Sequence, residues 1–444
     1  MRLTFPALLR ETPFRRFWIG QTISMFGDQV TSLALPVVAV LYLGAEAEQM
    51  GLLTAVGLLP HLLFSLPAGV WLDRVRARRR LMILADIGRA AAIAFIPLAF
   101  FLNFLSLPLL FGVGFVVGTL SVVFDISWNT VYVAVAKRDQ YIEANSLLNG
   151  SRSLSSVGGP AIGGILVQVL SAPLALVADA FSYLGSALFL GRTVAPEAPI
   201  EGDPGSIRSQ LATGLKFIAR DAIVSPTLLS VGILNFFNYC FQALLYLYVL
   251  DILKVEPGVF GFALGAGAVG AVIGAITASG IGRHLGLGRA YALGLILFPL
   301  ATILIPVAAP DAPTPVVLAL LFLAEFGSGF GVMILDINVG AMLVARTPDR
   351  IRGRANGAFR FINMGIRPIG ATVGGLLGGI LGVRETLFIV TILQLAGVLT
   401  LIGSPILKIR DMPEPAEDPQ RPEAPAPEAP APEAPAAEAP ADEP

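Results

Sequence analysis

A short polar hairpin, Gly69-Val-Trp-Leu-Asp73-Arg74-Val-Arg76-Ala-Arg78-Arg79-Arg80, separates two long apolar segments of the sequence. Five of its last seven residues are arginines, and arginine is costly to place in the hydrocarbon core of a bilayer. Membrane proteins retain loops rich in Lys and Arg in the cytoplasm. The hairpin therefore predicts two membrane spans joined on the cytoplasmic side.

The composition predicts an integral membrane protein. Of the 444 residues, 55% are apolar and 14% are charged, which is more apolar side chain than a soluble core of this length uses. The single cysteine, Cys240, excludes an internal disulfide, and the two histidines lie too far apart in the sequence to suggest a metal site. We expect no metal and no cofactor. The first residues do not resemble a cleaved signal peptide.

Apolar segments long enough to span a bilayer, at about 20 residues each, recur along the chain. Loops on the side of Arg76, together with both termini, hold 24 of the 30 Lys and Arg residues, whereas the opposite loops hold two. This bias predicts both termini in the cytoplasm and a place in the cytoplasmic (inner) membrane. The twelve predicted spans are 14–43, 50–72, 81–103, 107–136, 145–170, 173–191, 223–250, 257–281, 290–309, 315–345, 355–382 and 386–408.

A long connection, residues 192–222, divides the spans into six and six. Its first part is rich in Pro and Gly, and from Ser206 its apolar residues recur at helical spacing, which predicts a helix on the cytoplasmic membrane surface. We expect an all-α integral membrane fold of twelve transmembrane helices in two pseudo-symmetric six-helix bundles. The bundles cover residues 1–191 and 223–410, and a tail, 411–444, follows.

The tail repeats Glu, Ala and Pro and has no apolar face to bury, so we expect it to be disordered in the cytoplasm. A solvated spacer explains this composition, and a partner-binding role is the alternative. Its ten acids and one arginine also explain why the formal net charge of the whole chain is only −1.

Charged residues occur at matching places in the two halves. Asp125, late in span four, is matched by Asp336, late in span ten. Arg152, eight residues before a proline, is matched by Arg360, eight residues before another proline, and paired glycines follow in both halves. The pattern indicates a duplicated six-helix unit.

The hairpin, the duplication and the twelve spans together resemble the major facilitator superfamily. The loop between spans two and three of that superfamily has a glycine, then Asp-Arg and a basic pair. The resemblance implies a monomeric transporter of small molecules that is neither an enzyme nor a nucleic-acid-binding protein, with the proton gradient as its energy source. The matching residues, implied to act in gating, are Gly69, Asp73, Arg74, Arg78 and Arg79.

Two further segments narrow the resemblance. Span one, with Phe14-Arg-Arg-Phe-Trp and Gly27-Asp28, is similar to the branch of exporters for macrolides and the siderophore enterobactin. Span five contains Gly159-Pro160-Ala-Ile-Gly163-Gly164, which is similar to a glycine motif of proton-coupled antiporters in the same superfamily. Helix packing is the alternative role of this motif, because small residues permit close contact and proline bends a helix.

Two carboxylates within spans are candidates for proton coupling, because hydrocarbon excludes charge. Asp28 shares one helical face with Gln21 and Ser24, which are candidate substrate-cavity residues. Glu325 lies in span ten, beside small residues that leave room for a ligand. A structural hydrogen-bonded aspartate and a paired glutamate are the alternatives.

Other polar residues within spans suggest a gate and a second cavity wall. We expect Asp125 with Arg152, and Asp336 with Arg360 or Arg367, to form ion-pair clusters that close the cytoplasmic side in one state; static buried pairs are the alternative. A polar and aromatic stripe on span seven suits a bulky amphiphile, although hydrogen bonds between helices also explain its amides. The stripe consists of Asn235, Asn238, Tyr239 and Gln242.

The sequence thus predicts a secondary active exporter of amphiphilic small molecules, drug-like, macrolide-like or siderophore, that exchanges them for protons by alternating access. A translocator of lysophospholipid or another lipid is the alternative within transport. A membrane sensor or scaffold that transports nothing is the alternative outside it.

Overall fold

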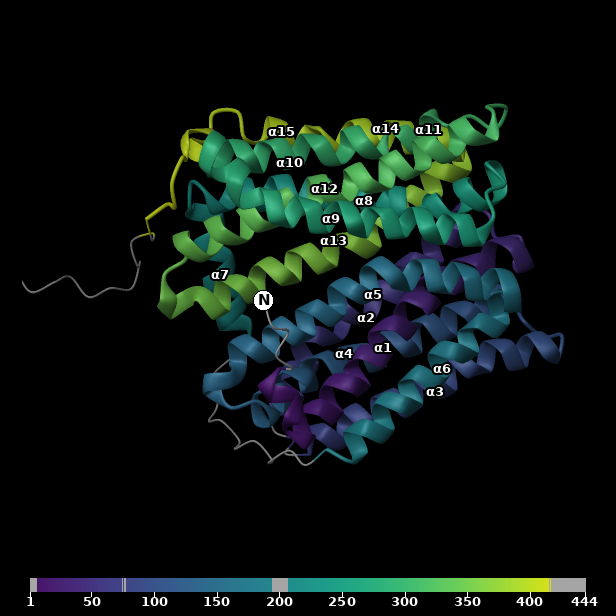
Figure 1. The fold of residues 1–444 in the computed structure, drawn as a ribbon. Helices are drawn as coiled ribbons and strands as arrows, with labels where there is room; N and C mark the ends of the chain where they lie inside the picture. The colour runs from purple at the N-terminus through teal and green to yellow at the C-terminus, as the bar shows by residue number, and fades with distance from the viewer. Residues whose placement is uncertain (1–5, 74, 76, 194–206, 415, 417–444) are drawn as a thin grey trace, which may run out of the picture.

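The computed structural model describes residues 6–73, 75, 77–193, 207–414 and 416, and within these residues it contains helices and no β-strand. The helices form two bundles that lie side by side (Figure 1). The first bundle contains α1 (Thr12–Val37), α2 (Ala47–Asp73), α3 (Arg78–Phe101), α4 (Leu107–Val135), α5 (Tyr141–Leu170) and α6 (Ala172–Gly191). The second contains α8 (Val224–Leu247), α9 (Pro257–Leu285), α10 (Leu287–Thr302), α11 (Leu304–Val307), α12 (Thr314–Arg346), α13 (Arg352–Leu381), α14 (Val383–Gln394) and α15 (Ala396–Leu399).

Among the described residues, eleven helices are long and apolar enough to cross a membrane. The remaining predicted span is broken into α14 and α15, neither of which is long enough alone. The chain there changes to tighter turns, in which Leu395 N–H donates to Ile392 O and Leu401 N–H donates to Val398 O. Gly397 allows this segment to lie against the backbone of Ser230 in α8.

The connection between the bundles contains one described helix, α7 (Ile207–Arg220). It packs against α13 and α8. Gly214 allows the close approach, because a Cβ there would lie 2.3 Å from Arg354 O. Asp221, directly after α7, accepts hydrogen bonds from the N–H groups of Ile223 and Val224. It also forms an ion pair with Arg346 at 2.8 Å. These contacts fix the start of α8. Residues 194–206, 415 and 417–444, which include the Pro/Gly-rich part of the connection and most of the tail, lie outside the described residues.

The two bundles repeat one packing scheme. In the first bundle α1 packs against α5 and α6, and α3 packs against α4 and α6. In the second, α8 packs against α13 and α14, and α10 packs against α12 and α14. Each contact in one bundle thus has a counterpart in the other.

A π-helical turn ends the first span of each bundle. These turns, η2 (Val38–Tyr42) and η4 (Tyr248–Ile252), contact each other. Each is closed by a backbone hydrogen bond to the sixth preceding residue, from Ala45 N–H to Ala39 O and from Val255 N–H to Val249 O. The duplication is therefore visible in backbone detail.

The glycine pairs fix the register between the halves. Gly163 approaches Val30 of α1, and Gly374 approaches Cys240 of α8. In this register Pro160 corresponds to Ala371, so the sequence alignment of Pro160 with Pro368, and with it Arg152 with Arg360, is wrong by three residues. The backbone contacts of the glycines decide the register, whereas a proline bends a helix wherever it stands.

The bundles meet closely at one end. At the crossing of α5 and α9, a Cβ on Gly261 would lie 2.3 Å from Pro160 O; at the crossing of α2 and α13, a Cβ on Gly51 would lie 2.6 Å from Gly375 Cα. Gln168 also donates to Glu256 at 2.8 Å across this junction. We name this the opposite end; the basic end is the other, where the described segments 77–80, 137–140, 207–222, 283–289 and 346–354 lie.

Ser171, between α5 and α6, has a backbone conformation that favours glycine. Its φ is +82° and its ψ is 154°, and its hydroxyl makes no capping hydrogen bond to α6. The corresponding residue between α13 and α14 is Gly382, with φ +95° and ψ 150°. We expect Ser171→Gly to raise the free energy of unfolding by about 1 kcal/mol, measured as a higher Tm in detergent.

Ser106→Gly is the matched control, because Ser106 also precedes a helix with proline in its first turn and makes no capping bond, but its φ is −151°. Glycine there relieves no strain and should leave the Tm unchanged or lower. A Ser171→Gly protein no more stable than wild type would contradict the argument.

Candidate functional site

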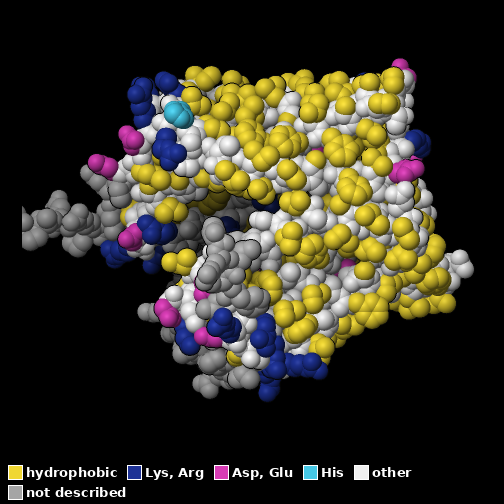
Figure 2. Space-filling view, in the orientation of Figure 1, with side chains coloured by type: hydrophobic (Ala, Val, Ile, Leu, Met, Phe, Trp, Pro, Cys, Tyr) yellow, Lys and Arg dark blue, Asp and Glu magenta, His cyan; other side chains and the backbone are white. Residues whose placement is uncertain are grey.

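A cavity of about 700 Å³ lies between the bundles and opens toward the basic end. Figure 2 shows the surface hollowed between the two bundles, with Lys and Arg side chains on either side of the hollow. Its walls combine an apolar side with amides, hydroxyls and charges. The lining residues are Gln21, Ser24, Met25, Asp28, Gln29, Arg89, Phe124, Asp125, Trp128, Asn129, Asn145, Leu148, Asn149, Arg152, Ser155, Ser156 and Arg360.

The predicted polar face of span one lines this cavity. Asp28 is exposed to it, whereas Gln21 and Ser24 are largely covered by neighbouring helices. The hydroxyl of Tyr183, on α6, donates to Asp28 Oδ1 at 2.6 Å. Tyr183 lies one helical turn after Asp179 and was not predicted as a site residue from the sequence.

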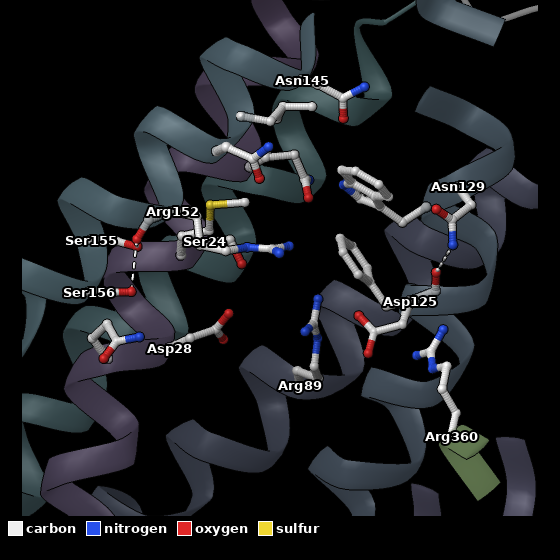
Figure 3. A pocket seen from close by; sticks show the side chains of 17 residues that line it. Ser24, Asp28, Arg89, Asp125, Asn129, Asn145, Arg152, Ser155, Ser156 and Arg360 are labelled. Atoms are coloured by element: carbon white, nitrogen blue, oxygen red, sulfur yellow. Dashed lines mark hydrogen bonds between the residues drawn. The ribbon is translucent and has the colours of Figure 1, made fainter. Parts of the chain in front are cut away.

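Arg89 connects Asp28 to the interior of the first bundle. Its guanidinium carbon lies 4.2 Å from the centre of the Phe124 ring and 4.4 Å from that of the Tyr183 ring. It forms an ion pair with Asp86 one turn earlier on α3, and Asp86 is fully buried. In Figure 3, the side chains of Arg89 and Asp28 point into the same part of the cavity. Arg89 therefore supplies a positive charge held between two aromatic rings beside Asp28.

A second buried acid is hydrogen-bonded nearby. Asp179, which has no partner evident from the sequence, accepts hydrogen bonds from Thr31 on α1 and from Ser182 on α6. Gly27 makes room for this contact, because a Cβ there would overlap Ser182 and Asp179. The polar contacts of α1 with α6 thus run along the same face as Asp28.

The expected ion-pair clusters are not formed. Asp125 approaches His61 on α2, with 3.9 Å between carboxylate oxygen and imidazole nitrogen, and no ion pair joins it to Arg152 among the described residues. The two side chains stand on opposite walls of the cavity, and Arg360 reaches in from the second bundle (Figure 3). The open cavity separates the groups.

The corresponding pairs in the second bundle are not formed either. Arg367 donates to Asn363 Oδ1 at 2.8 Å and to the hydroxyl of Tyr239 at 3.1 Å. No ion pair joins Asp336 to Arg360 or Arg367 within the described part of the chain. Arg367 therefore ties α13 to α8, and Asp336 is exposed.

The hairpin residues that can be described hold the first bundle together. Arg78 donates to the hydroxyl of Thr130 at 2.7 Å. Arg79 donates to the carbonyl oxygens at the end of α6, those of Leu190, Gly191 and Thr193, where a positive charge is favourable. Arg74, the side chain of Asp73 and the surroundings of Gly69 are not among what the structure describes.

The remaining candidates lie away from this cavity. Asn235 donates to Val231 O within α8, and the buried Asn238 Oδ1 has no hydrogen-bond partner. Gln242 is exposed and, like Asn235, Asn238 and Tyr239, is not among the lining residues. Glu325, on α12, lies against Gly267 of α9, and no hydrogen bond or ion pair is found for its carboxylate among the described residues.

The glycine motif of span five packs two helices at once. Gly159 and Gly163 approach α1, where a Cβ on Gly159 would lie 2.5 Å from the Gln29 side chain. Gly164 faces α9, with Pro257 O at 2.9 Å from the position of its Cβ. Among the described residues, no three His, Cys, Asp or Glu side chains lie together as a metal ion requires.

Residues 4–431 match the family described as transmembrane secretion effector, MFS_3. The chain belongs to this family. It is a membrane transporter of the major facilitator type. An uncharacterized MFS-type transporter of Bacillus subtilis, YfiS, is 24% identical over 403 residues, which are 88% of this chain and 93% of that protein.

Solved structures share the fold at low identity. The nucleoside transporter NupG is 12% identical, with a TM-score of 0.68 over 88% of this chain and 98% of its own. A bacterial homologue of the iron transporter ferroportin, in an inward-facing state, is 17% identical, with a TM-score of 0.67 over 89% of this chain and 99% of its own. These similarities establish the twelve-helix fold and leave the substrate to be inferred from the cavity.

The buried Asp86–Arg89 pair allows a test of the charge arrangement. Arg89→Met leaves a buried carboxylate without its partner, so we expect the free energy of unfolding to fall by about 3–5 kcal/mol. The double variant Asp86→Leu/Arg89→Met removes both charges and should recover most of that loss. Thermal unfolding in detergent measures both effects. A single variant as stable as the double variant would show that Asp86 has another partner.

Proposed function

We propose that the protein exports amphiphilic small molecules, drug-like, macrolide-like or siderophore, in exchange for protons by alternating access. The observation that carries the proposal is Asp28, an acid exposed to a cavity between the bundles and hydrogen-bonded to Tyr183 beside the buried Arg89. The similarity of span one to macrolide and siderophore exporters supports the substrate class.

The cavity walls suit a molecule with one apolar and one polar side. Phe124 and Trp128 offer aromatic surface, and Trp128 is held by stacking on Tyr132 at 5.3 Å between ring centres. Amides and hydroxyls of α1 and α5 offer donors and acceptors on the facing wall. A volume of about 700 Å³ is within the range of small-molecule sites.

Competition between a proton and a substrate for the Asp28 carboxylate explains how one could be exchanged for the other. Ionised Asp28 attracts Arg89 and any cationic or hydrogen-bond-donating group of a substrate; protonated Asp28 loses that attraction. A proton and a substrate therefore displace each other. One proton crossing about 100 mV releases about 2.3 kcal/mol, which corresponds to a gradient of roughly 40-fold for a neutral substrate.

The end of the cavity that is open in this structure indicates where the gate lies. By the distribution of Lys and Arg, the basic end faces the cytoplasm, so this conformation receives substrate from the cytoplasm. No ion pair joins Asp125, Arg152 and Arg360 within the described residues, and we propose that they, together with Asp336 and Arg367 of the second bundle, pair when the basic end closes. The hairpin arginines would then stabilise the closed state.

Translocation of a lysophospholipid is the second candidate. The cavity is lined by two acids, Asp28 and Asp125, and by the bases Arg152 and Arg360, so a zwitterionic headgroup would find partners for both of its charges. Movement of labelled lysophospholipid in proteoliposomes separates this function from efflux. A sensor or scaffold would transport neither.

We expect cells that produce the wild-type protein to accumulate less of a lipophilic cation or macrolide, and a protonophore to abolish the difference. Asp28→Asn cannot exchange a proton and should remove export, whereas Tyr183→Phe keeps the acid and should reduce export only partly. Accumulation of a fluorescent substrate measures this, with expression matched by immunoblot. Glu325→Gln tests the second carboxylate, and its loss of export with full activity of Asp28→Asn would move the proton site to α12.

Alternating access requires the glycine crossing at the opposite end to close. Gly261→Val places side-chain atoms within the α5 backbone and should hold the bundles apart there, so substrate accumulation should return to that of cells without the protein. Gly280→Val, on the same helix with nothing within 4 Å of its Cβ position, is the matched control and should keep wild-type export. Equal activity of the two variants would exclude this role for the crossing.

A further inference from the structure

A second cavity, of about 640 Å³, lies at the basic end of the second bundle, away from the path between the bundles. It is bounded by α9, α10, α12 and the segment 409–412 that follows η6 (Pro405–Lys408). This segment is held in place, because Leu287 and Gly288 donate their N–H groups to Arg410 O and Ile409 O at 3.2 and 3.0 Å. The cavity is therefore built from the ends of several helices and from a segment of chain that hydrogen bonds hold in place.

Basic side chains line this cavity. They are Arg283, His284, Arg289 and Arg410, and Asp411 is the one acid among the lining residues. All three arginines are exposed, and none forms an ion pair with Asp411 or another acid within the described residues. Within the described part of the chain, the three arginines of the cavity thus outnumber its one acid, and its lining carries a net positive charge.

The corresponding loop of the first bundle differs. There Arg79 is bound to three carbonyl oxygens at the end of α6, and Arg78 is bound to Thr130. The loop between α9 and α10 is the second copy of that hairpin, and among the residues that the structure describes no hydrogen bond or ion pair is found for its arginines, Arg283 and Arg289. They are available to an anion from outside the chain.

An exposed apolar stripe leads to this charge. Val269, Val272, Ile273 and Ile276 recur on one face of α9 at helical spacing, and Ile276 is 75% exposed. The same face continues through Ser279, a lining residue, to Arg283. Figure 2 shows Lys, Arg and His side chains that border the hydrophobic surface of the second bundle at this end. An acyl chain on the stripe would place a headgroup phosphate at the arginines.

We propose that this cavity binds an anionic phospholipid of the cytoplasmic leaflet, with its phosphate at Arg283, Arg289 and Arg410 and one acyl chain along the stripe of α9. Basic pockets between transmembrane helices on the cytoplasmic side suit such headgroups. The lipid would tie the loop between α9 and α10 to the segment 409–412. The site is independent of the proposed substrate cavity and of proton exchange.

Lipid binding to the purified protein tests the proposal. Native mass spectrometry and thermal unfolding in detergent compare dioleoyl-phosphatidylglycerol with dioleoyl-phosphatidylcholine and with inorganic phosphate. We expect phosphatidylglycerol to bind and to raise the Tm, and the other two to have little effect. Arg283→Gln/Arg289→Gln should weaken phosphatidylglycerol binding roughly 30-fold.

The matched control is Arg80→Gln/Arg220→Gln, which removes two exposed charges of the same end outside this cavity and should leave binding unchanged. If the double variant does not fold, the single variants Arg283→Gln and Arg289→Gln replace it, each with an expected loss of roughly five-fold. Equal binding of phosphatidylcholine overturns the proposal, as does unchanged binding by the variants. Equal stabilisation by inorganic phosphate would assign the site to a free anion and overturn the lipid.

Discussion

Backbone contact between glycines is the constraint on which the arrangement of the bundles depends. At the crossings of α5 with α9 and of α2 with α13, the chains approach so closely that a single Cβ would overlap backbone atoms of the other helix. Lipid offers no hydrophobic drive for helices to associate, so close van der Waals contact at small residues has to supply the attraction. The two bundles are therefore joined at one end and free to separate at the other.

Because the bundles separate at the basic end, the charged groups inside the first bundle border an open cavity. Asp28 faces the open space and is still tied to the bundle through Tyr183, and Arg89 is fixed between two rings with Asp86 beneath it. The positive charge beside Asp28 is thus held in place by its neighbours, whereas Arg152 and Arg360 project from different bundles. In the proposed mechanism, the charge beside Asp28 would discriminate between occupants, and the two arginines of the rim would respond to closure.

Much of the fold could be predicted from the sequence, because span length, loop charge and the internal repeat each follow from local composition. The face shared by Gln21, Ser24 and Asp28 was predicted by helical spacing and lines the cavity. The partners of Asp28 and Asp179 could not be predicted, since they depend on how α1 and α6 are rotated against each other. The ion pairs predicted for Asp125 and Asp336 are not formed in this conformation and stay a prediction for the closed state. The offset between Pro160 and Pro368 was hidden because the decisive contacts join helices distant in sequence.

The two π-helical turns have the same backbone geometry although their residues differ. Gly44 and Lys254 follow the turns at corresponding places, and both have a left-handed backbone, with φ of +61° and +54°. Such a conformation is easy for glycine and costly for lysine, yet a backbone hydrogen bond to the sixth preceding residue closes both turns. The backbone preference of Lys254 therefore does not explain why its turn has the same geometry as the turn that ends at Gly44. The two halves therefore share a backbone shape at this turn although their residues differ.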